Sequence, residues 1–133
     1  MTAATQSIYT TLRYRDAMAA IDFLERAFGF ERGAVHQGDD GTVQHAELRY
    51  AGEWIMLGST SDGRDGRLAV ENGPTWVYVV VDDPDAHYER AVAAGAEIVR
   101  GLTDEDFGSR DYTVRDPEGN VWSFGTYVPG AAG

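Results

Sequence analysis

The sequence predicts an α+β fold built from two tandem βαβββ modules. Both halves show the same order of elements: a strand, a capped helix, a glycine and three more strands. Short segments recur in the same order, 64 to 67 residues apart: Glu25-Arg26-Ala27 with Glu89-Arg90-Ala91, Gly29-Phe30-Glu31 with Gly95-Ala96-Glu97, and Gly52 with Gly119. Ordered recurrence at one spacing indicates an internal repeat.

The first module is predicted to begin with a strand over Ile8–Tyr14. Asp16 is then placed to cap a helix whose apolar residues recur near the helical period up to Phe28, and Gly29 follows as a C-cap. Three strands are expected after this helix, separated by a Gly-Asp-Asp-Gly turn and an Ala-Gly turn: Phe30–Gln37, Val43–Tyr50 and Trp54–Gly58.

The second module is predicted to begin with the β-branched strand Thr75–Val81. Asp83 is placed as its helix cap, with Pro84 at the first helical position and the helix ending near Ala94. Three strands are again expected: Ala96–Arg100, Asp111–Arg115 and Asn120–Tyr127. We therefore predict modules at residues 1–58 and 75–133, joined by a Gly-, Asp- and Ser-rich linker at 59–74, in one compact domain.

Composition excludes several functions. The 133 residues contain no cysteine, and all eleven basic residues are arginine, which excludes thiolate and lysine Schiff-base chemistry. A net charge of −11 disfavours nucleic acid and anionic membranes as partners. The N-terminal segment has no signal-peptide pattern, so we expect a cytoplasmic protein.

Two sets of segments resemble the vicinal oxygen chelate superfamily, which includes glyoxalase, bleomycin resistance proteins and extradiol dioxygenases. They are Tyr14-Arg15-Asp16 and Ala27-Phe28-Gly29-Phe30 in the first half, and Ala94-Gly95-Ala96 and the turn Asp116-Pro117-Glu118-Gly119-Asn120 in the second. The resemblance implies an open curled sheet around one pocket with the helices on its convex face. It also implies a homodimer.

Metal-binding relatives hold the ion with His, Glu or Gln on the first and last strand of each module. The family's spacing from Asp16 and from Gly119, checked by the internal repeat, maps those four positions to Tyr9, Met56, Trp76 and Ser123. An indole only donates hydrogen bonds, and a thioether is too soft for hard cations. We therefore expect no metal site and no cofactor, in contrast to the metalloenzymes of the family.

Strand alternation extends the set of predicted ligand-binding residues. Residues on the same face as the four positions are expected to line the pocket, while Ile8, Thr10, Leu12 and Leu57 are expected to face the helices. The predicted ligand-binding residues are Tyr9, Thr11, Arg13, Trp54, Met56, Trp76, Tyr78 and Ser123. The aromatic side chains either form a slot for a flat, apolar or cationic molecule or fill the cavity themselves.

The weaker catalytic candidates are His45, Glu47 and Arg13. His45 and Glu47 are two residues apart on one strand, so their side chains share a face. They could be two metal ligands or an acid–base pair, or they could simply form a hydrogen bond on a solvated face. Arg13 is placed to bind an anionic ligand group or to pair with Glu47. His36 has no evident partner, and His87 is expected to be exposed on the outer helix. The acidic segment 103–108 is read as a solvated turn or as a lid over the pocket.

The sequence favours a metal-free protein that binds a small aromatic or hydrophobic molecule, including cationic ones, as its partner. The alternative is a metal-dependent lyase, isomerase or dioxygenase of the same superfamily with a relocated site near His45 and Glu47. A metal-independent enzyme that uses Arg13, His45 or Glu47 for proton transfer is a third reading.

Overall fold

The computed structural model describes residues 6–64, 66, 69–73 and 75–130. These residues divide into two compact units. The first contains the described residues up to Glu25 and those from Gly29 to Gly73, and the second contains Arg26–Phe28 together with the chain from Thr75 onward. The predicted linker is partly outside the described residues, and its described part contains a bridge between Ser61 and Val70.

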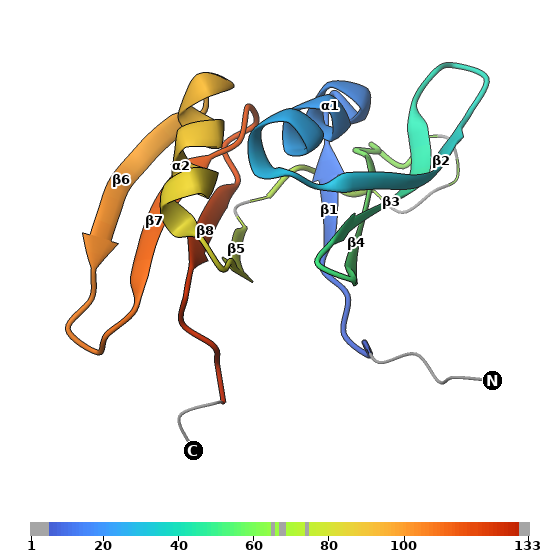
Figure 1. Ribbon diagram of the computed structural model, residues 1–133. Helices are drawn as coiled ribbons and strands as arrows, with labels where there is room; N and C mark the ends of the chain where they lie inside the picture. Colours follow the sequence, from blue (N-terminus) through green and yellow to red (C-terminus); the bar gives the residue numbers. More distant parts are fainter. Residues whose placement is uncertain (1–5, 65, 67–68, 74, 131–133) are drawn as a thin grey trace. The chain divides into compact units, whose positions relative to one another are not determined.

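Each unit has the predicted βαβββ order of elements (Figure 1). In the first unit the elements are β1 (Thr11–Tyr14), α1 (Ala17–Phe28, of which Arg26–Phe28 belong to the second unit), β2 (Glu31–Gln37), β3 (Val43–Tyr50) and β4 (Glu53–Ser59). In the second they are β5 (Trp76–Val80), α2 (Pro84–Ala93), β6 (Glu97–Asp104), β7 (Arg110–Arg115) and β8 (Val121–Gly125). The prediction of an α+β fold with two such modules is confirmed.

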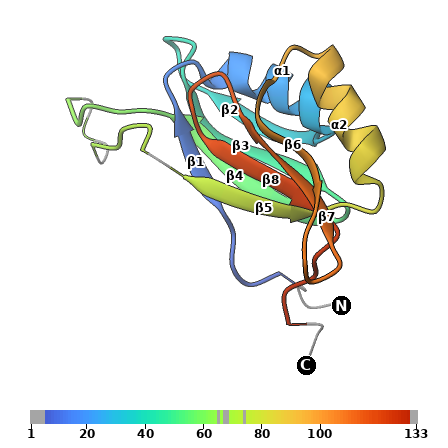
Figure 2. The same cartoon turned by 90° about the vertical axis from the view of Figure 1, so that its left-hand side faces the viewer.

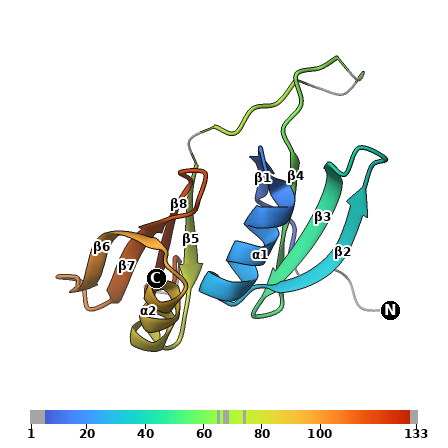
Figure 3. The same cartoon turned by 90° about the horizontal axis from the view of Figure 1, so that it is seen from above.

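Each unit contains a four-stranded mixed sheet. The strand orders are β1-β4-β3-β2 and β5-β8-β7-β6, and the first strand of each sheet pairs in parallel with the last (Figure 3). The parallel pairing exists because the helix carries the chain across one face of the sheet (Figure 2). Neither sheet closes on itself, so one face of each is left without a helix.

Both helices begin at the predicted aspartates. The Asp16 side chain accepts a hydrogen bond from the Ala19 amide at 3.1 Å, and Asp83 accepts one from Ala86 at 3.1 Å. These bonds satisfy amide groups that have no partner inside the helix. Helix α1 ends at Gly29, whose φ of 82° lies in the left-handed region, as expected for a glycine C-cap.

The internal repeat extends to the pairing register. Thr11 pairs with Met56 in the first sheet, and Tyr78 pairs with Ser123 in the second, with both members of the pair offset by 67 residues. The same duplication appears in ion pairs between neighbouring strands, at 2.8 Å for Arg49 and Glu31 and at 2.9 Å for Arg115 and Glu97. The register therefore supports the sequence mapping of equivalent positions.

The helix-facing side of the first sheet is apolar, as predicted from strand alternation. Leu12 and Leu57 are neighbours on β1 and β4, and both are nearly fully buried, with Ala46 and Leu48 on β3 beside them. The opposite side, which we call the open face, contains Thr11, Met56 and Glu47 in one row across the sheet. The open face is where polar and aromatic side chains remain accessible.

One part of the predicted facing pattern is wrong. Ile8 lies before β1 and is 88% exposed, whereas the sequence placed it in the strand against the helix. Gln6 bonds through its side chain to the backbone N and O of Trp54, where a strand residue would use its backbone. Backbone pairing with β4 reaches back to Thr10, whose carbonyl accepts from the Met56 amide at 2.9 Å, and Ile8 lies outside it.

Strand β6 is longer than predicted and takes in the start of the acidic segment. Thr103 and Asp104 are its last residues, and the hairpin turn is closed by a bond from the Glu105 amide to the Ser109 carbonyl at 2.7 Å. Thr103 and Asp104 remain paired with β7 because the turn sits further along, at Gly108, whose φ is 97°. Among the described residues no helix is long and apolar enough to cross a membrane.

Candidate functional site

The open face of the first unit has a cavity of about 270 Å³. Its lining consists of Tyr9, Glu47, Trp54 and Met56. The sheet register explains why three of them converge: Glu47 pairs with Met56 across β3 and β4, and Trp54 lies two residues before Met56 on the same face. Of the described residues that line it, three are apolar or aromatic, and Glu47 is the only charged one.

Trp54 is held in place by its surroundings. Its ring lies over Gly33, where a Cβ atom would come within 2.6 Å of the ring carbon Cζ3. The Arg49 guanidinium lies 5.7 Å from the Trp54 ring centroid and is itself fixed by its ion pair with Glu31. A glycine on β2 and a paired arginine on β3 therefore set the orientation of this wall of the cavity.

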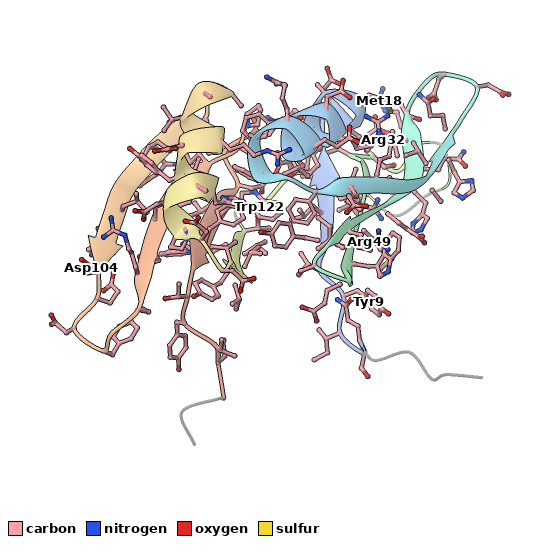
Figure 4. The ribbon with its side chains drawn as sticks, viewed as in Figure 1. Tyr9, Met18, Arg32, Arg49, Asp104 and Trp122 are labelled. Carbon is pink, nitrogen blue, oxygen red and sulfur yellow. The ribbon has the colours of Figure 1, made fainter. Side chains whose placement is uncertain are left out.

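Tyr9 is brought to the cavity by the segment that precedes β1. The Trp54 amide donates to Gln6 Oε1 at 2.7 Å, and Gln6 Nε2 donates to the Trp54 carbonyl at 2.9 Å. This two-bond contact holds residues 6–10 beside the start of β4. Tyr9 lies just below the start of β1 (Figure 4), and the residue is 37% exposed.

His45 and Glu47 share a face of β3 and bond to each other, as the sequence indicated. Their atoms Nε2 and Oε2 are 2.9 Å apart, and both side chains are 41% exposed. The His36 ring stacks against His45 with 6.1 Å between centroids, so His36 does have a partner. In the described part of the chain, no three His, Cys, Asp or Glu side chains gather as a metal site, and His45 and Glu47 have no third ligand.

Thr11 and Arg13 lie on the same face but do not line the cavity. Arg13 pairs with Gly58, and its guanidinium occupies the space where a Cβ at Gly58 would be. No carboxylate in the described segments forms an ion pair with Arg13, so of the two alternatives for this residue the pair with Glu47 is not formed there. The Arg13 side chain is half-buried.

In the second unit, three of the predicted ligand-binding residues are engaged with their own module. The Trp76 indole donates to Ser123 Oγ at 2.8 Å, although the residue is 71% exposed. Ser123 also bonds to Thr113 at 3.0 Å, and the Tyr78 hydroxyl donates to the Tyr127 carbonyl at 2.8 Å. Trp76 and Ser123 therefore bond to each other at the two positions where relatives place metal ligands.

The residues at the four family positions do not fit a metal ion. Trp76 has only a donor group, and that donor is directed at Ser123. Met56 offers a thioether, which is unsuited to hard or borderline cations, and Tyr9 leaves a single phenol oxygen. The donor chemistry thus disagrees with the metal site of the family's enzymes.

His87 corrects the prediction of an exposed outer-helix residue. It is only 9% exposed, its Nε2–H donates to the Phe28 carbonyl at 2.8 Å, and its Nδ1 accepts from the Tyr112 hydroxyl at 2.5 Å. Burial lowers the pKa of His87, although the bond to Phe28 opposes this shift. His87 shares one face of α2 with Ala91, four residues later, which is also buried.

Several residues that build the cavity were missed at the level of sequence. Gln6, Gly33 and Arg49 position Tyr9 and Trp54, but each acts through contacts that cross strands. The sequence predicts Glu47 as a metal ligand, an acid–base or hydrogen-bond partner of His45, or an ion-pair partner of Arg13, whereas its place in the cavity lining follows from its pairing with Met56 on β4. Strand alternation along Val43–Tyr50, once that strand is paired with the strand that contains Met56, would have placed Glu47 on the open face.

The two βαβββ units, with an open sheet face in each, define the fold class of a large group of small-molecule-binding proteins and enzymes. The model of the Glyoxalase/Bleomycin resistance protein/Dioxygenase superfamily matches residues 6–124. The chain belongs to this superfamily.

Similar proteins come from several bacteria. The uncharacterized protein Rv0887c of Mycobacterium tuberculosis is 38% identical over 119 residues, which cover 85% of this chain and 69% of that protein. The crystal structure of TioX from Micromonospora sp. ML1 superimposes with a TM-score of 0.75 at 36% identity, covering 92% and 97% of the two chains. Lactoylglutathione lyase from Agrobacterium tumefaciens, at 20% identity and a TM-score of 0.69 over 93% and 95% of the chains, shares the fold.

Proposed function

We propose that this protein binds a small aromatic or hydrophobic molecule in the cavity of its first unit, without the metal ion of the family's enzymes. The observation that carries the proposal is the lining of that cavity by Tyr9, Trp54 and Met56 beside one carboxylate. Aromatic walls provide a large contact area, and methionine adapts to irregular ligand shapes. A mostly apolar pocket with few polar groups is typical of small-molecule sites.

The donor chemistry at the four family positions supports the metal-free part of the proposal. A thioether and an indole replace two of the ligands that an ion would require, and the indole is already bonded to Ser123. Membership in the superfamily is compatible with both binding proteins and enzymes, because the fold hosts many chemistries. The lining of the cavity therefore carries the functional argument.

Proton–nitrogen correlation spectra of the three indole groups test this proposal directly. Quinoline, a flat neutral molecule at pH 8, is added as the probe. We expect the Trp54 indole resonance to shift on saturation, while the indole of Trp122, which is fully buried and bonded to Asp116 at 3.1 Å, stays in place.

Two variants complete this experiment. Tyr9→Ala removes one wall of the cavity and is expected to weaken quinoline binding several-fold. Tyr127→Ala removes a similarly exposed ring outside the cavity and is expected to leave binding unchanged. Equal shifts of all three indole resonances, or no shift at millimolar quinoline, would count against binding in this cavity.

A further inference from the structure

We infer that the molecule bound in the first unit is a planar organic cation and that Glu47 is its counter-ion. This inference rests on the proposed function and specifies the chemical class of its ligand. The first observation is that Glu47 is the only charged residue among the described residues that line the cavity, where it lies with Tyr9, Trp54 and Met56. An apolar cavity with one carboxylate favours a ligand that combines flat apolar surface with positive charge.

The Glu47 carboxylate has capacity for a ligand. Its partner His45 contacts one oxygen, Oε2, whereas an ionised carboxylate offers about four acceptor sites. Glu47 lines the cavity, and its side chain is 41% exposed. A ligand cation can therefore approach without breaking the His45 bond.

The arginines of the same sheet are engaged with other groups. Arg49 pairs with Glu31 at 2.8 Å, and Arg32 pairs with Asp22 at 2.7 Å and with Glu25. Arg13 lies over Gly58, and no ion pair joins it to Glu47 within the described residues. Among the described residues, no arginine therefore compensates the negative charge of Glu47.

The second unit shows that the fold does not require a carboxylate at this position. Glu47 pairs with Met56 on β3 and β4, and the corresponding pair on β7 and β8 is Thr113 with Ser123. The duplicate thus has a neutral threonine that bonds to its neighbour at 3.0 Å. The carboxylate is present in the Glu47–Met56 pair and absent from the equivalent Thr113–Ser123 pair. This difference points to a role for Glu47 in binding and not in holding the sheet together.

The rest of the cavity suits the same class of ligand. Aromatic ring faces attract cations, and the Arg49 guanidinium 5.7 Å from the Trp54 centroid already exploits this property. The charge of Arg49 is balanced by Glu31, so it adds little repulsion. A volume of about 270 Å³ lies near the lower end for ligand pockets and matches a molecule of one or two fused rings. The net charge of −11 adds a long-range attraction.

Titration with three probes of similar shape tests the inference: N-methylquinolinium, quinoline and 2-naphthoate, which are cationic, neutral and anionic at pH 8. For the wild-type chain we expect the cation to bind about tenfold more tightly than quinoline, and the anion to bind least. Glu47→Gln preserves the shape of the side chain and is expected to remove the advantage of the cation. Glu97→Gln is the matched control, because it removes the same charge from an exposed position in the second unit. This variant is expected to bind the cation more tightly than quinoline, as the wild-type chain does.

The outcomes separate this inference from the proposed function. Equal affinity for the cation and quinoline, with the Trp54 resonance shifting, would overturn the inference and leave the binding function in place. If a Glu47→Gln variant still bound N-methylquinolinium about tenfold more tightly than quinoline, Glu47 would not be the counter-ion. A dispersed amide spectrum verifies that this variant is folded. Failure of all three probes to bind would contradict the proposed function together with the inference.

Discussion

Replacing Asp116 with alanine is expected to be among the most destabilising single changes in the second unit. Asp116 is 4% exposed and is the hub of the turn between β7 and β8. Its carboxylate accepts from the Glu118 amide at 3.0 Å, from the amide and side chain of Asn120 at 3.1 Å each, and from the Trp122 indole at 3.1 Å. The alanine side chain removes all of these acceptors.

The magnitude follows from the donors left behind. Asn120 is 1% exposed and Trp122 is fully buried, so their orphaned N–H groups have little access to water. Each buried donor without a partner costs about 1 to 3 kcal/mol, and some relaxation of the turn recovers part of this. We expect the free energy of unfolding to fall by about 3 to 5 kcal/mol, a large share of the roughly 5 to 15 kcal/mol typical of small domains.

Urea denaturation monitored by near-ultraviolet circular dichroism measures this loss. The matched control is Asp106→Ala, which removes an exposed aspartate from the hairpin turn between β6 and β7 and should change the unfolding free energy by less than about 0.5 kcal/mol. A loss below about 1 kcal/mol for Asp116→Ala would contradict this expectation, because it would show that water or other groups satisfy the N–H donors that Asp116 leaves behind.

The remaining predictions concern one glycine, one turn residue and one buried histidine. Gly33→Ala places a Cβ 2.6 Å from the Trp54 ring, so we expect about 1 to 3 kcal/mol of destabilisation in urea and weaker quinoline binding; unchanged binding would contradict the contact. Ala51 has a φ of 50° beside Gly52, so Ala51→Asn creates an Asn-Gly turn and should raise the melting temperature by a few degrees; a lower one would argue against this turn. Burial lowers the pKa of His87 below its ordinary value of 6.5, so the unfolded chain binds the proton more tightly. The stability from neutral His87 is therefore complete above pH 6.5 and is lost as the pH falls below it, and His87→Phe should flatten urea midpoints measured between pH 7.5 and 5; an unchanged slope would contradict this assignment.

The sequence predicted the order of elements well because local signals mark them. Asp16 and Asp83 cap the two helices, and Gly29 ends the first at a positive φ. The repeat then constrained the register: mapping Tyr9 to Trp76 and Met56 to Ser123 used the same 67-residue offset that relates the Thr11–Met56 and Tyr78–Ser123 pairs. Caps, turns and duplication are properties of neighbouring or equivalent residues, so a single chain reveals them.

The sequence was less informative where side chains cross between elements. Nothing local reveals that Gln6 holds the Trp54 backbone or that Ile8 lies outside the strand. His87 was misread because its helix face is defined by Phe28 and Tyr112, which lie 59 and 25 residues away in the chain. The choice between an open slot and a filled core also depended on packing, and the cavity of about 270 Å³ lies beside Met56 in the first unit.

We propose that this chain keeps the superfamily's fold but binds no metal ion at Tyr9, Met56, Trp76 and Ser123. The decisive measurement is metal content by plasma mass spectrometry, on untagged protein purified without chelators and then dialysed against Mg²⁺, Mn²⁺, Fe²⁺, Ni²⁺ or Zn²⁺. We expect far less than one ion per chain in every case, because Trp76 and Met56 provide no suitable donor. One tightly held ion per chain, lost in a His45→Ala or Glu47→Gln variant, would contradict it and favour a metal-dependent enzyme with a relocated site.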